Sequence, residues 1–167
     1  MVWFIGTPVA LPPGDPDPVP SEAHVRPLLP PDRHVTVVFL GNVPDDTAQA
    51  GWQALPELSL PAEASAQRWA RFGRSALALE LADDDGRWED AAVTAVEAVT
   101  SLVTVRSPSP FRPHVTMARV PRRAKPPTAS ALARWALPIQ PLRVGPLTLF
   151  HSAPSGSERR YVAVEQR

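Results

Sequence analysis

The sequence predicts an α+β fold made of two pseudo-symmetric lobes of antiparallel sheet, with helices on the outside and a cleft between the lobes. Three observations indicate this fold class. Runs of predicted strands are broken by isolated helices, without the regular strand–helix–strand alternation of a parallel sheet. The second half of the chain repeats the order of the first half, which is strand, helix, strand, strand. The tripeptide His-Val-Thr occurs in both halves, at residues 34–36 and 114–116.

The first elements are a strand, a proline-rich connection and a second strand. Residues 2–6 form an apolar run that is too short for a signal-peptide core or a membrane span, so they predict a strand. Prolines interrupt residues 11–31, where few large apolar side chains occur, and we expect an extended connection there. Residues 34–40 predict the next strand, which ends at Gly41 and Asn42.

A short helix and two strands follow. The Asp-Asp-Thr segment at residues 45–47 supplies N-cap chemistry for a helix that runs through Leu55 and stops at Pro56. Residues 65–72 and 75–81 predict a pair of strands with a turn between them, because leucines alternate with smaller or polar residues in the second run.

An amphipathic helix is predicted over residues 87–103, where apolar side chains recur at three- and four-residue spacing. It follows the acidic turn at residues 83–86, which lacks the alternating oxygen ligands and distant glutamate of a calcium loop. The second half then predicts a strand over residues 114–120, a short helix near 128–135, and strands near 142–150 and 161–164.

Composition limits the class of protein and its partners. A chain of 167 residues fits one domain, residues 1–167, divided into two lobes. The 17 basic side chains equal the 17 acidic ones, so any contact with RNA must be local. The absence of cysteine excludes disulfides, thiolate nucleophiles and cysteine-based metal sites. We expect a cytoplasmic monomer that uses no cofactor or metal and does not associate with membranes.

The two His-Val-Thr copies are the candidate catalytic residues. Alternate side chains of a strand share a face, so His34 lies beside Thr36, and His114 lies beside Thr116. Near neutral pH one histidine of a pair can be a neutral base while the other is a protonated acid. That division suits displacement at phosphorus, where the attacking oxygen loses a proton and the leaving oxygen gains one.

The residues around both copies resemble the bacterial 2′-5′ RNA ligases, or RNA 2′,3′-cyclic phosphodiesterases, of the 2H phosphoesterase superfamily, which carry two His-x-Thr/Ser-x motifs. The matching segments are HVTVVFLGNVP at residues 34–44 and PFRPHVTMAR at residues 110–119. Residues near both ends of the chain, at 4–12 and 149–161, are similar to the family's first strand and its C-terminal strand pair. The family usually has a helix where residues 11–31 are rich in proline.

The resemblance implies hydrolysis of a terminal 2′,3′-cyclic phosphate on RNA to a 2′-phosphate, and a 2′-5′ RNA ligase activity is also associated with the family. By motif, His34 would be the general acid that protonates the leaving 3′ oxygen. His114 would be the general base that activates water. Thr36 and Thr116 would bind the phosphate oxygens, and the partner would be an RNA end.

Two arginines are candidate substrate-binding residues. Arg119 matches a family arginine that contacts phosphate, although strict alternation turns it away from the face of His114, so the strand must twist or end first. Arg112 is the second candidate. The same alternation places Phe39 opposite the histidine face and predicts that it belongs to the core.

Three alternatives remain open. A phosphodiesterase of the same superfamily could act on a nucleotide-derived cyclic phosphate, because the geometry at phosphorus is the same. A non-catalytic RNA-end-binding module would bind phosphate with its arginines and turn nothing over. A metal hydrolase with His34 and His114 as ligands is disfavoured, because few aspartates or glutamates lie near either motif.

Overall fold

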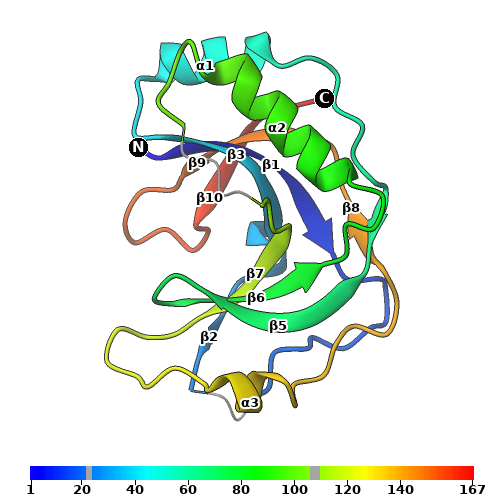
Figure 1. The fold of residues 1–167 in the computed structure, drawn as a ribbon. Coiled ribbons are helices and arrows are strands. Elements are labelled where there is room, and N and C mark those ends of the chain that lie inside the picture. Colours follow the sequence, from blue (N-terminus) through cyan, green and yellow to red (C-terminus); the bar gives the residue numbers. More distant parts are fainter. Residues whose placement is uncertain (22–23, 106–109) are drawn as a thin grey trace.

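A strongly bent antiparallel sheet forms the frame of the molecule and nearly closes on itself (Figure 1). The computed structural model describes residues 1–21, 24–105 and 110–167. Parts of two predicted segments, the proline-rich connection at residues 22–23 and the approach to the second motif at 106–109, therefore lie outside the described residues. The α+β class with antiparallel pairing is confirmed, since every pair of strands in the ladder is antiparallel.

The elements in chain order are β1 (Trp3–Ala10), β2 (Arg26–Pro27), a 3-10 turn (Pro30–Asp32), β3 (His34–Gly41), α1 (Asp45–Ala54), β4 (Glu63–Ala64), β5 (Ala66–Phe72), β6 (Ala76–Leu81), α2 (Arg87–Val99), β7 (His114–Arg119), α3 (Ala129–Leu132), β8 (Leu142–Val144), β9 (Thr148–Ser152) and β10 (Tyr161–Gln166). The main sheet has the order β10-β9-β1-β3-β7-β6-β5. β2 adds to β7, while β8 pairs with both β1 and β4.

Two lobes meet where β3 and β7 lie side by side. One lobe contains β10, β9, β1 and β3, with α1 and α2 against it, and the other contains β7, β6, β5 and β2 (Figure 1). Each lobe therefore contributes one His-Val-Thr strand. The lobes do not follow the two halves of the chain, because β5 and β6 pair toward β7 whereas β9 and β10 pair toward β1.

Two apolar clusters fill the interior. Under α1 and α2, Trp52 and Val99 pack with Ile5 and Leu40 of the sheet. In the other lobe, Trp88 from the start of α2 packs among the buried side chains of β6 and β7. Helix α2 therefore contributes to both clusters and ties the lobes together.

Several element boundaries differ from the predictions for local reasons. Helix α2 ends at Val99, and the chain then closes a tight turn in which the amide nitrogens of Leu102 and Val103 bond the Val99 carbonyl. Position 44, a proline without a side-chain cap, occupies the N-cap of α1, so the acidic residues that follow lie in the first turn. The predicted connection over residues 11–31 includes β2 and the start of the 3-10 turn.

The predicted strand at residues 142–150 is two strands. The break between them includes Gly145 and Pro146. The Gly145 amide donates a hydrogen bond to the carbonyl oxygen of Pro8 at 2.8 Å, and Pro146 has no amide hydrogen to donate to a neighbouring strand. β8 consequently pairs with the end of β1, while β9 pairs with its beginning.

Gly6 permits the close approach of β1 to the first motif strand. A Cβ atom at this position would lie 2.4 Å from the carbonyl oxygen of Val35, a backbone atom that cannot move without shifting β3. Gly6 pairs with Thr36, so any such shift reaches the candidate site directly.

We expect Gly6→Ala to lower the free energy of unfolding by about 1–3 kcal/mol, because the added methyl group overpacks against the backbone. Urea unfolding followed by circular dichroism measures the change. Gly51→Ala in α1 is the matched control, since its Cβ would make ordinary contacts at 3.7 Å and alanine favours a helix. Equal stabilities of the two variants would contradict this account of Gly6.

Candidate active site

The two motif strands are joined at the pair Val35 and Val115. With this antiparallel register, His34 lies opposite Thr116 and Thr36 lies opposite His114, and all four side chains share one face of the sheet. Diagonal neighbours in such a pair are about 7–8 Å apart. All four side chains are half-buried, so none of them is sealed in the core.

The same backbone contact fixes each imidazole. Nδ1 of His34 lies 2.9 Å from the carbonyl oxygen of Asp32, and Nδ1 of His114 lies 2.8 Å from the carbonyl oxygen of Arg112. A carbonyl only accepts, so Nδ1–H is the donor in both cases. Each neutral ring therefore leaves Nε2 as a free acceptor.

An ion pair anchors each of the residues that provide these carbonyls. The buried Asp32 carboxylate accepts from Nε of Arg159 at 2.9 Å and from the amide of Arg160 at 3.0 Å. The Arg112 guanidinium donates two hydrogen bonds to Glu80, at 2.8 and 2.9 Å. The positions of both histidines are thus set by charged contacts to distant elements.

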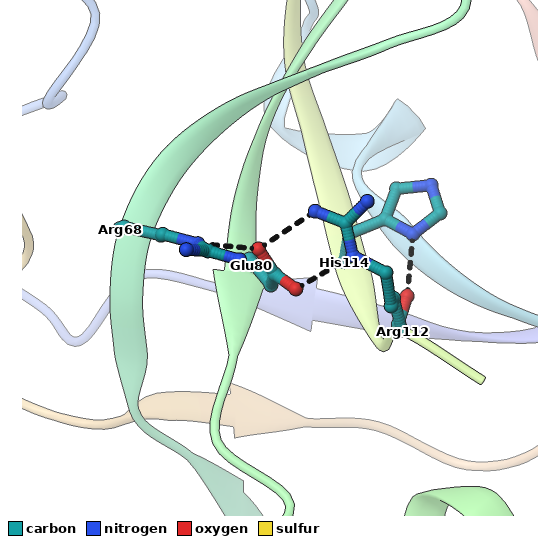
Figure 2. A network of polar contacts seen from close by, with 4 residues as sticks. All are labelled: Arg68, Glu80, Arg112 and His114. Atoms are coloured by element: carbon teal, nitrogen blue, oxygen red, sulfur yellow. Dashed lines mark hydrogen bonds and ion pairs between the residues drawn. The ribbon is translucent and has the colours of Figure 1, made fainter. Parts of the chain in front are cut away.

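Figure 2 shows the second of these anchors. Glu80 is only 7% exposed and lies between two guanidinium groups, since Arg68 donates from the other side at 2.7 Å. Hydrogen bonds, first of all from Arg112, lower the pKa of the Glu80 carboxyl to about 2. Glu80 is paired with His114 across the β6–β7 ladder, so the network lies next to the ring that it supports.

Aromatic rings cover both imidazoles. Phe4 stacks on His34 with 4.6 Å between ring centroids, and Tyr161 meets the same imidazole edge-on at 4.8 Å. Phe72 stacks on His114 at 3.8 Å and carries the Arg112 guanidinium 4.7 Å from its ring centroid. These rings hold the imidazoles in place and remove water from one side of each.

Loss of hydration makes both histidines weak bases. Burial, against the opposing effect of the Asp32 carbonyl, lowers the pKa of His34 to about 4. Burial also lowers the pKa of His114, against a similar contact from Arg112. The charge of Arg119 contributes to the lowering of both pKa values, which places its guanidinium within electrostatic reach of both rings. Both imidazoles are neutral at pH 7 in the free protein.

A β-bulge directly after each threonine decides which way the next residues face. The ladder skips one residue, Val37 in β3 and Met117 in β7. One extra residue reverses the alternation of the strand. Phe39 and Arg119, each five positions after its histidine, therefore return to the histidine face. The prediction that Phe39 belongs to the core is wrong, and its side chain is 52% exposed.

The two predicted substrate-binding arginines differ in how many of their nitrogens already have a hydrogen-bond partner. Nε of Arg119 is buried without a hydrogen-bond partner among the described residues, and its Nη1 lies 3.5 Å from the Ser75 hydroxyl. Nε and Nη2 of Arg112 both donate hydrogen bonds to Glu80. Arg119 lies on the histidine face and forms no ion pair among the described residues, so it is the better placed of the two to bind an anion.

Sequence reasoning missed the residues that support the histidines. Glu80 had a readable signal, because it is the one charged residue in the apolar strand ALALEL. Phe72 and Asp32 had none, since their contacts depend on strand register and on a loop that returns from the C-terminal end. His151 contacts Trp3 on the opposite face of the sheet, away from the motif pair.

The described residues do not gather three or more histidine, aspartate or glutamate side chains into a group that fits a metal ion. None of their helices has the length and apolar character needed to span a bilayer.

The chain shares its fold with several solved structures. No family model matches the chain, and no curated protein matches it in sequence. TT0787 of Thermus thermophilus has a TM-score of 0.67 at 18% identity, over 99% of this chain and 96% of that one. E. coli LigT complexed with 3′-AMP also has a TM-score of 0.67 at 18% identity, over 99% and 95% of the two chains. A structure described as a phosphoesterase has a TM-score of 0.66 at 19% identity, covering 99% and 96%. These similarities establish that the chain has a LigT-like fold.

We expect Glu80→Gln to lower the free energy of unfolding at pH 7 by about 1–3 kcal/mol, because two guanidinium groups lose their carboxylate. Urea unfolding measures the change. Asp85→Asn is the control, since it removes the exposed pair between Asp85 and Arg87 and should leave stability unchanged. Indistinguishable losses in the two variants would show that the Glu80 network is no more important than a surface pair.

Acid should destabilise the free protein through His34. The unfolded chain takes up this proton near pH 6.5, whereas the folded chain does so only near pH 4. The unfolded state therefore binds more protons between these values, and the free energy of unfolding falls as the pH is lowered through this window. Urea titrations should show a loss of about 1–3 kcal/mol between pH 7 and pH 5, and a smaller one in His34→Gln. A profile unchanged by this substitution would rule out a lowered pKa at His34.

Proposed function

We propose that the protein hydrolyses the 2′,3′-cyclic phosphate at an RNA end to a 2′-phosphate, with His34 and His114 as a metal-independent acid–base pair. The matched setting of the two imidazoles carries the proposal. Each holds Nδ1 on a backbone carbonyl, each leaves Nε2 free, and both lie on one face of adjoining strands. A histidine with a structural role needs only one such contact. Two imidazoles held in the same way fit the two proton transfers that displacement at a single phosphorus atom requires.

In the proposed reaction, Nε2 of His114 accepts a proton from water as the water oxygen forms a bond to phosphorus. The bond between phosphorus and the 3′ oxygen breaks, and His34 donates a proton from Nε2 to that oxygen, which leaves a 2′-phosphate. Thr36 and Thr116 bind the non-bridging oxygens together with the Arg119 guanidinium, which forms no ion pair among the described residues.

His34 must gain a proton before it can act as the acid, because its pKa is about 4 in the free protein. A phosphate anion bound beside the ring favours the imidazolium form and raises the pKa again. Substrate binding is thereby coupled to proton uptake. Until substrate arrives, the ring stays neutral among its aromatic neighbours.

A nucleotide substrate is supported by two independent observations. E. coli LigT, which has the same fold, has been solved with 3′-AMP, NADP+ and ATP. In this chain, the exposed ring of Phe39 on the histidine face offers a base a surface to stack on. A 2′-5′ RNA ligase activity would use the same groups, with a 5′-hydroxyl in place of water. A free nucleotide with a cyclic phosphate is the second candidate substrate, because NADP+ and ATP are not RNA.

The decisive test is to incubate chelator-treated protein with a short RNA that ends in a 2′,3′-cyclic phosphate and to identify the product by mass spectrometry and chromatography. We expect a 2′-phosphate. His34→Ala and His114→Ala should each reduce kcat/KM at least about 100-fold, in keeping with the usual contribution of general acid–base catalysis. His151→Ala is the matched control, a strand histidine on the opposite face, and should keep wild-type activity.

A second substrate separates the two roles. An aryl phosphodiester with a nitrophenolate leaving group needs no acid, so it should restore turnover to His34→Ala but not to His114→Ala. The opposite pattern would exchange the roles, and a 3′-phosphate product would reverse the choice of leaving oxygen. RNA binding without turnover by the wild type would indicate a binding module.

A further inference from the structure

A groove lined by arginines opens where the second motif strand ends. It has a volume of about 670 Å³ and lies between the turn that joins β5 to β6 and the segment that follows β7. Three arginines line it, Arg71, Arg74 and Arg122. All three are exposed, and no acidic residue is among the lining residues. Within the described residues none of the three forms an ion pair.

The groove adjoins the candidate active site at one side chain. Ser75 lines the groove and also lies 3.5 Å from Nη1 of Arg119. Arg119 lies on the histidine face, so the groove begins beside a residue proposed to bind the reacting phosphate. Its remaining wall, which includes Val120 and Pro121, is apolar and suits the faces of bases or riboses.

We propose that this groove binds the phosphodiester backbone of single-stranded RNA on the 5′ side of the terminal cyclic phosphate. The proposal rests on the proposed function, because the terminal phosphate sets where the RNA enters the groove. Unpaired guanidinium groups without nearby carboxylates match a row of phosphates. A chain with no net charge gains its attraction for RNA only from such a local concentration of cations.

The groove predicts a preference for length that the histidines alone do not give. A nucleoside 2′,3′-cyclic phosphate reaches the catalytic residues but leaves the groove empty. An RNA of several nucleotides occupies both. Replacing Arg71, Arg74 and Arg122 together with glutamine should therefore reduce kcat/KM for the longer substrate about 10-fold or more, and leave the mononucleotide unchanged.

Salt dependence gives a second readout. Each phosphate contact on a single strand contributes about 0.7 to the slope of log affinity against log salt concentration. Fluorescence anisotropy with a labelled RNA that ends in a 3′-phosphate should therefore show a slope smaller by about 2 in the triple variant. Arg143→Gln is the matched control, since Arg143 is an exposed arginine of β8 outside the groove, and it should behave as the wild type.

The outcomes separate the groove from the chemistry. If the triple variant keeps both the length preference and the salt slope of the wild type, the proposal that the groove binds RNA is wrong. If the wild type hydrolyses neither substrate, the proposed function fails, and the anisotropy slopes still decide whether the arginines bind RNA. A melting temperature equal to that of the wild type confirms that the triple variant is folded.

Discussion

One hydrogen bond, from Nδ1 to the carbonyl two residues earlier, underlies the arrangement of each histidine. It fixes the tautomer and the direction of Nε2, and the surrounding contacts keep that carbonyl and that ring in place. Around His34 this support comes from the ion pair of Asp32 with Arg159 and from the ring of Phe4. Around His114 it comes from Glu80 and from the ring of Phe72, in the same roles. The duplication seen in the tripeptides therefore extends to their supports, although the charges of the ion pairs are exchanged.

The bulges after the threonines are the second shared device. Without them, Arg119 would point away from its histidine, and Phe39 would compete for space in the core. With them, one lobe presents a cation and the other an exposed ring at equivalent positions of the same face. A symmetric frame thus offers two different surfaces to a ligand that has a charged end and a flat end.

Local patterns in the sequence were sufficient to predict most strands and the type of fold. The strands that begin at His34 and His114 start where the prediction puts them, because their apolar residues must alternate with polar ones on a half-buried sheet. Neither bulge could be predicted, since Val37 and Met117 are ordinary strand residues and the skip exists only in the register against neighbouring strands. The order of elements along the chain likewise gave no indication that β9 pairs with β1 and that β10 adds to β9, because this pairing joins segments far apart in the sequence.

The ion-pair partners of Glu80 were also beyond prediction from the sequence. A single acidic residue in an apolar strand indicates a buried charge that needs a partner, but many arginines could have supplied it. The choice of Arg112 and Arg68 follows from the packing of β5 and the segment before β7 against β6. The candidate catalytic side chains were therefore easier to recognise than the contacts that hold them.

The separation along the chain of the residues around His34 has a consequence during synthesis on the ribosome. The supports of His114 span residues 68–114 and are complete once β7 has emerged. Those of His34 include Arg159 and Tyr161, 125 or more positions after it along the chain. A nascent chain halted before β10 therefore carries one finished histidine site and one unfinished one. The pair of histidines therefore reaches its final arrangement only after β10 has been synthesised.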